Sequence, residues 1–128
     1  MREEMRVPGL PEPISHYTDA VRFGDLLFVS GCAPLDADGE LVGAGDVTAQ
    51  TRKVLENLGL ALAHAGAGFG DVLKVTVYMT DIARRAEANV VRREFFGDAL
   101  PASTLVEVSG LAIDGMLIEI EAVAGLAR

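Results

Sequence analysis

Hydrophobic residues recur at every third or fourth position in two stretches of the chain, and this spacing predicts two helices. The first is expected to begin at Asp46, whose side chain is placed to cap it, and to end near Ala65. The second is expected over roughly Arg84 to Phe96. The apolar face of the first helix consists of Val47, Val54, Leu55, Leu58, Leu62 and Ala65, and that of the second of Ala88, Val91 and Phe95.

Alternation of apolar and polar residues predicts strands on either side of these helices. Residues 20–31 are expected to form two short strands joined by a glycine-aspartate turn. Residues 71–81 alternate as a half-buried strand does. The last two strands are expected within residues 103–110 and 116–125. The expected buried side of the third strand holds Leu73, Val75, Val77 and Met79.

The resulting order, ββαβαββ, predicts an α+β fold with a mostly antiparallel sheet and both helices on one of its faces. A single domain is expected over residues 1–128. Within it, residues 1–18 are expected to be an irregular arm, because Pro8, Pro11 and Pro13 block a helix. The opposite sheet face still carries apolar side chains, although only 5% of the residues are aromatic. A partner subunit is the natural cover for that face, so we expect an oligomer.

Composition narrows the classes of function. The net charge of −8 repels phosphate backbones, so no nucleic-acid partner is expected. No apolar run is long enough to span a bilayer, and residues 1–13 contain no apolar signal core, which favours a cytoplasmic protein without a membrane partner. The single cysteine, Cys32, allows neither an intrachain disulfide nor a thiolate metal cage, and His16 and His64 lack metal-ligand spacing. We therefore expect no metal.

Carboxylates within apolar strand sequence are the first candidates for chemistry. Glu119 and Glu121 share one face of their strand by its two-residue period, and Glu107 lies in the preceding strand. A solvated polar face of an antiparallel sheet is the commoner interpretation of such a pattern. The alternative is that one carboxylate lines a cleft between subunits and moves a proton.

Other single residues allow two interpretations each. Cys32 is interpreted as a small buried residue and not as a nucleophile, because no cationic neighbour is at hand to lower its pKa. Tyr17 is typical of a packing aromatic with its hydroxyl satisfied at an edge, and His16 is expected to be exposed. Asn89 is a poor helix former in mid-helix, which indicates either a specific hydrogen bond or a tolerated surface position.

Several segments, in the same order along nearly the whole chain, resemble the Rid (reactive intermediate deaminase, YjgF-like) family. They include SHYTDAV, GDLLFVSGCAP, ANVVRREFF and LPASTLVEV, and the most specific are GDVLKVTVYMTD and IEIEAVA. The resemblance implies a chorismate-mutase-like fold and a homotrimer with clefts between its subunits. It also implies hydrolysis of an enamine or imine to a carbonyl compound and ammonia, with no metal or organic cofactor.

The resemblance also suggests roles for individual residues. Tyr17 matches a tyrosine that lines the cleft, and Gly31 matches a glycine whose carbonyl helps to hold the attacking water. Asn89 matches a helix asparagine near the site. Glu119 matches a strand glutamate that positions or activates the water. This set is chemically sufficient, because an imine carbon is already electrophilic and needs only a held water and a proton acceptor.

One position departs from the family pattern. In family members that act on small 2-imino acids, this strand opens with a proline, a small residue and an arginine that grips the substrate carboxylate. Here the third of these is Ser103, which is neutral and offers one donor, and Leu105 stands where a cysteine is expected. The departure predicts weak activity on 2-iminopropanoate and 2-iminobutanoate. A larger substrate such as 2-aminomuconate is a candidate.

The missing charge has further consequences. Loss of a positive neighbour predicts that Glu119 ionises less readily in a dry cleft. Arg92 and Arg93 follow Asn89 by three and four residues, so they either hold a distal carboxylate or form a solvated helix face. Ser15 and His16 replace the glycine-proline pair that commonly precedes the family's tyrosine. The alternative function is a trimer that binds a small metabolite without turning it over, and ribonuclease activity is disfavoured by the acidic charge.

Overall fold

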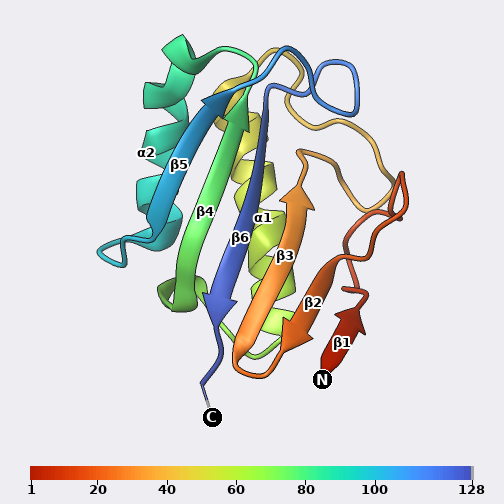
Figure 1. Ribbon diagram of the computed structural model, residues 1–128. Coiled ribbons are helices and arrows are strands. Elements are labelled where there is room, and N and C mark those ends of the chain that lie inside the picture. Colours follow the sequence, from red (N-terminus) through yellow and green to blue (C-terminus); the bar gives the residue numbers. More distant parts are fainter. Residues whose placement is uncertain (128) are drawn as a thin grey trace.

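A six-stranded sheet with both long helices on one of its faces makes up the fold (Figure 1). The structure, a computed structural model, describes residues 1–127. Its strands are β1 (Arg2–Met5), β2 (Ala20–Phe23), β3 (Leu26–Cys32), β4 (Val72–Met79), β5 (Ala102–Glu107) and β6 (Ile118–Gly125). Its helices are α1 (Val47–His64) and α2 (Arg85–Phe96), with short 3-10 turns η1 (Phe69–Asp71) and η2 (Ile82–Arg84).

The strands lie in the order β1-β2-β3-β6-β4-β5. Every pairing is antiparallel except β4 with β5, which are joined through α2 as parallel neighbours. The predicted α+β fold and its ββαβαββ order from Ala20 onward are therefore confirmed.

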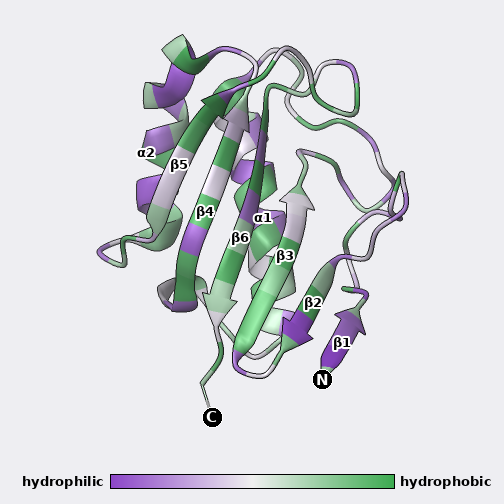
Figure 2. Ribbon diagram, viewed as in Figure 1, coloured by the Kyte–Doolittle hydropathy of each residue, from purple (hydrophilic) through white to green (hydrophobic). Residues whose placement is uncertain are grey.

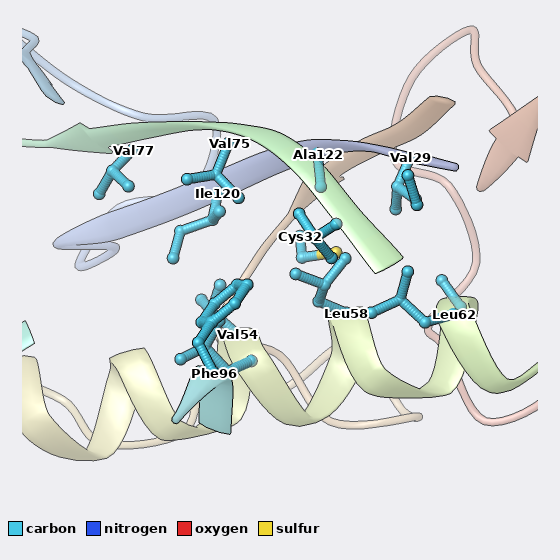
Figure 3. Packing of buried hydrophobic residues seen from close by; sticks show 14 of the residues in the cluster. Val29, Cys32, Val54, Leu58, Leu62, Val75, Val77, Phe96, Ile120 and Ala122 are labelled. Carbon is cyan, nitrogen blue, oxygen red and sulfur yellow. The ribbon is translucent and has the colours of Figure 1, made fainter. Parts of the chain in front are cut away.

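The core lies between the sheet and α1. Val54, Leu55 and Leu58 of α1 have no exposed surface and belong to the core cluster. Val54 and Leu58 lie on the side of the helix that faces the central strands (Figure 3). Asp46 caps the helix as predicted, because its side chain accepts a hydrogen bond from the Ala49 N–H at 3.0 Å. The helical spacing of apolar residues thus placed this face correctly.

The prediction of a wholly irregular arm over residues 1–18 is wrong at its start. Residues 2–5 form β1 and pair with β2, although they are hydrophilic almost throughout (Figure 2). Backbone hydrogen bonds form this edge strand, so no apolar alternation marks it. The buried carboxylate of Asp19 accepts hydrogen bonds from the Val7 N–H at 2.8 Å and from Arg6 Nε at 3.1 Å, which ties the following segment to the sheet.

The prediction that Leu73 is buried is also wrong. The pairing of β4 with β6 shifts register between Val72 and Lys74, so that Val72 is buried and the Leu73 side chain is 52% exposed. A bulge of this kind transfers one residue to the other face of a sheet. Leu73 therefore joins Leu26 and Phe28 on the face opposite the helices.

Candidate functional site

A cavity of about 320 Å³ lies between the segment after β1 and the adjoining ends of β3 and β6. Its wall is largely apolar, with Leu10, Ile14 and Met116 among the lining residues. Polar groups reach it from Tyr17, Gly31 and Glu119, three of the residues that the family resemblance predicted for a cleft. An apolar cavity with few polar groups is typical of a small-molecule site.

Glu119 is the central polar group of this cavity. Burial raises the pKa of its carboxyl, and the nearby charge of Glu121 raises it further, in the direction expected from the sequence. The neighbouring Tyr78 hydroxyl donates its hydrogen bond to Glu121, at 3.0 Å. Within residues 1–127, no group donates a hydrogen bond to the Glu119 carboxyl or forms an ion pair with it. The half-buried carboxyl is therefore available to a water or a ligand.

Gly31 provides the space that the Glu119 side chain occupies. A Cβ atom at position 31 would overlap Glu119 Oε2 and would lie 2.7 Å from its Cδ. The pairing of β3 with β6 also shifts register between Val29 and Cys32, so two residues of β3 face one residue of β6 here. Bulges of this type release backbone groups from the regular ladder and recur beside active sites.

The segment that carries Tyr17 is fastened to the same bulge. The Ser30 hydroxyl donates to the Thr18 carbonyl at 2.6 Å, and the Ser30 N–H donates to the Asp19 carbonyl at 3.0 Å. The hydroxyl of Tyr17 accepts a weak hydrogen bond from the Ile14 N–H at 3.4 Å, and the side chain remains 47% exposed. The hydrogen bonds of Ser30 thus hold Tyr17 beside Gly31 and Glu119.

Cys32 lines the cavity but is an unreactive residue. Burial raises the pKa of its thiol to about 12, with smaller contributions from Glu119 and Asp19. The thiol stays protonated near neutral pH, and a thiol is a far weaker nucleophile than a thiolate. This agrees with its interpretation as a small buried side chain.

Asn57 of α1 also lines the cavity and was not among the predicted site residues. Its Nδ2 donates to the carbonyls of Ala33 and Leu35, both at 2.9 Å, and so shapes the loop that follows β3. Its Oδ1 is buried and has no hydrogen-bond partner among residues 1–127. The signal in the sequence was an asparagine next to the apolar Leu58 on a mostly apolar helix face.

Asn89, Ser103 and Leu105, the remaining predicted site residues, lie at the other edge of the sheet. A second pocket of about 200 Å³ between α2 and the start of β5 is lined by Asn89, Arg92 and Arg93. Arg92 Nη2 donates to Ser103 Oγ at 2.9 Å, and Leu105 shares the face of β5 with Ser103. Strand β4 lies between β5 and β6, the strand that carries Glu119, and Glu119 lines the first pocket but not the second (Figure 1).

The fold and the cavity define a small α+β protein with a half-buried strand glutamate in an apolar binding site. The chain belongs to the family described as Endoribonuclease L-PSP, the YjgF/Rid family, which it matches over residues 9–126.

Individual relatives cover almost the whole chain. RutC family protein PH0854 of Pyrococcus horikoshii is 46% identical over 97% of this chain and 98% of its own length. The 3-aminoacrylate deaminase RutC of Acinetobacter baylyi is 38% identical over the same shares. The solved structure of the Rid family protein YyfA of Yersinia pestis has a TM-score of 0.91 and 34% identity, covering 98% of this chain and 100% of that one.

The described part of the chain contains neither a metal-binding cluster nor a membrane-spanning helix. Within residues 1–127, no group of three or more His, Cys, Asp or Glu side chains is arranged to hold a metal ion. In the same residues, no helix has both the length and the apolar composition needed to cross a membrane.

Proposed function

We propose that this protein hydrolyses a reactive enamine or imine to a carbonyl compound and ammonia. The observation on which this rests is the half-buried Glu119 carboxyl, which packs over Gly31 in an apolar cavity and has no partner within residues 1–127. Membership in a family that includes a 3-aminoacrylate deaminase supports the reaction class. The net charge of −8 is unfavourable for RNA, so we do not propose ribonuclease activity.

The reaction needs one group that accepts and returns a proton. An enamine first takes a proton from solvent at carbon and becomes an iminium cation. Water held between Glu119 and the Gly31 carbonyl adds to the iminium carbon while the carboxylate takes a proton from the water, which gives a neutral carbinolamine. The carboxylic acid then protonates the nitrogen, and the carbon–nitrogen bond breaks. Ammonia leaves, and the carbinolamine hydroxyl passes its proton to the carboxylate, and from there to solvent, as the carbonyl forms. A carboxyl with a raised pKa suits both steps, because it returns the proton readily near neutral pH.

The complete site requires more than one copy of the chain. We place Asn89, Ser103 and Leu105 of one subunit opposite Tyr17, Gly31 and Glu119 of its neighbour in a homotrimer. Two observations support this: Glu119 and Asn89 line separate pockets, and the open sheet face exposes apolar side chains such as Phe28. Sedimentation equilibrium tests the assembly, and a monomer at micromolar concentration would contradict it.

Ser103 is expected to alter the choice of substrate. Without a strand arginine, 2-iminopropanoate and 2-iminobutanoate should be poor substrates, and a larger one such as 2-aminomuconate should be better. The alternative is a trimer of the same fold that binds a small metabolite without turnover. The neutral Ser103 favours that alternative, whereas the available Glu119 carboxyl favours catalysis.

Ammonia release from freshly generated 2-aminoacrylate, its four-carbon homologue and 2-aminomuconate distinguishes these functions. Wild type should exceed the uncatalysed rate on at least one of them, and Glu119→Gln should lower that rate by ~10²–10⁴-fold because the proton acceptor is lost. Glu3→Gln, an exposed change on β1, should leave the rate unchanged. A wild-type rate equal to the uncatalysed rate on all three compounds would favour the binding protein.

A further inference from the structure

The pocket between α2 and β5 contains a partly buried guanidinium without a counterion. Arg92 forms no ion pair with any of residues 1–127, whereas Arg6, Arg52 and Arg84 each pair with a carboxylate. Desolvation alone lowers the pKa of Arg92. Taking a charge out of water is costly unless an opposite charge or hydrogen bonds compensate for it. An anion is therefore the ligand that this pocket lacks.

The guanidinium is held in place from the neighbouring strand. Arg92 Nη2 donates to Ser103 Oγ at 2.9 Å, which uses only one of the five N–H donors of an arginine. Because Ser103 acts as the acceptor here, its own hydroxyl hydrogen remains available. Asn89 lies three residues before Arg92 on the same helix face and lines the same pocket. These groups together offer several donors to one ligand.

Arg93 is a weaker candidate for the same task. It also lines the pocket, but its side chain is exposed and is not held by Ser103. An exposed arginine loses more side-chain entropy on binding than one that is already held in place.

We propose that Arg92 is the carboxylate-binding residue of this protein and that Ser103 is its positioning residue. The guanidinium that grips the substrate comes from α2 and not from β5. The inference rests on the proposed function, and it restricts the substrates to enamines and imines that carry a carboxylate. It also accounts for Ser103: an arginine at that position would place a second positive charge next to Arg92.

Binding of a stable product analogue tests this without turnover. The probe is 2-oxobutanoate, compared with its methyl ester, and the affinities are measured by isothermal titration on the assembled protein. Binding of this acid is compatible with poor turnover of 2-iminobutanoate, because a guanidinium on α2 instead of β5 holds a small molecule out of alignment with Glu119. Arg92→Gln should weaken the binding of 2-oxobutanoate by ~10-fold or more, since hydrogen bonds to charged groups are the stronger ones, and should leave the ester unchanged. Arg85→Gln is the matched control, because Arg85 lies on α2 outside both pockets and should change neither affinity.

Two further variants test the role of Ser103. Ser103→Ala should weaken the binding of 2-oxobutanoate by ~2–10-fold, and Ser103→Thr, which keeps a hydroxyl, should retain it. The double variant Arg92→Gln/Ser103→Arg moves the guanidinium from the helix to the strand. It should recover most of the affinity for the acid that Arg92→Gln loses, which also shows that the site remains folded.

Each other outcome overturns the proposal. It fails if wild type does not bind 2-oxobutanoate, if Arg92→Gln binds it as wild type does, or if Arg92→Gln loses the acid and the ester equally. Its failure is distinct from that of the proposed function. Arg92-dependent binding without ammonia release from any enamine would contradict catalysis only, and turnover that Arg92→Gln leaves unchanged would contradict the assignment of Arg92 only.

Discussion

At the scale of single residues, the position of the Glu119 carboxyl depends on the Cβ atom that Gly31 lacks. Glycine leaves the space in which the Glu119 carboxyl packs, and the surrounding burial raises the pKa of that carboxyl. The φ angle of Gly31 is not in the left-handed region, so the need for glycine here is a matter of space and not of backbone conformation. The position of the Glu119 carboxyl therefore depends on the absence of a side chain at residue 31.

Gly31→Ala is expected to displace the Glu119 carboxyl and to lower the deaminase rate by ~10²-fold, because an active-site group moved by about 1 Å loses its alignment. The measurement is ammonia release at saturating substrate. Gly70→Ala is the matched control, since a Cβ atom there meets nothing within 4 Å. Equal rates for the two variants would contradict the role assigned to Gly31.

The pH dependence of stability reports on Glu119 separately from activity. A carboxyl whose pKa is raised by folding releases its proton more readily in the unfolded chain. Its contribution to the free energy of unfolding therefore falls as the pH rises from below the unfolded-state pKa to above the folded-state one. Glu119→Gln removes this loss, so its stability relative to wild type should be greater at pH 7 than at pH 4. Urea unfolding at both pH values measures this, and the same difference in Glu3→Gln would count against the assignment.

At the scale of secondary-structure elements, helix α1 both packs against the sheet and holds two loops through hydrogen bonds. Its fully buried Gln50 donates from Nε2 to the carbonyls of Gly43 and Gly115 and accepts from the Leu117 N–H at 2.8 Å. These bonds hold the chain just before β6 and so fix the start of the strand that carries Glu119. One side chain thus links the helix, the loop before it and the strand that carries Glu119.

Gln50→Ala is expected to lower the free energy of unfolding by ~1–3 kcal/mol, because it leaves three partly buried backbone groups without this partner. Urea denaturation measures the change. Glu56→Ala lies on the exposed side of the same helix and should stay within about 0.5 kcal/mol of wild type. A similar loss in both variants would mean that helix propensity, and not the Gln50 hydrogen bonds, is responsible.

At the scale of the whole molecule, the sheet face that the helices leave uncovered is the surface through which we expect copies of the chain to associate. The helices cover one face only, and the other exposes Phe28 at 46% and Leu73 at 52% (Figure 1). Exposed apolar side chains gathered on one face are typical of a protein interface. Neighbouring copies packed on this face would remove the apolar surface from water.

Phe28→Asp is expected to shift the protein from trimer to monomer and to abolish deaminase activity, because a charge is buried at the interface and the site is no longer completed. Sedimentation velocity and circular dichroism measure assembly and fold on the same sample. Leu60→Asp, at a 40% exposed position on the outer side of α1, should remain trimeric. A trimeric and active Phe28→Asp protein would contradict the proposed interface.

Hydrophobic periodicity alone was sufficient to predict the two long helices and the strands β2 to β6. The apolar face of α1, its cap at Asp46 and the alternation of Ile118, Glu119 and Ile120 are local patterns, and the structure confirms them. Family membership was likewise readable from segments such as IEIEAVA, because it rests on residue identity and order.

The features that the sequence did not predict depend on contacts between segments that are distant in the chain. Strand β1 exists through backbone pairing with β2, and the bulge beside Val72 turns Leu73 outward, although neither leaves a pattern in its own residues. The separation of Glu119 from Asn89 and the bond from Arg92 to Ser103 likewise depend on the order of strands and the placement of α2. A local pattern of apolar residues predicts which face of a helix or strand is buried. Which elements meet, and therefore which side chains form a site, is set by the packing of the whole chain.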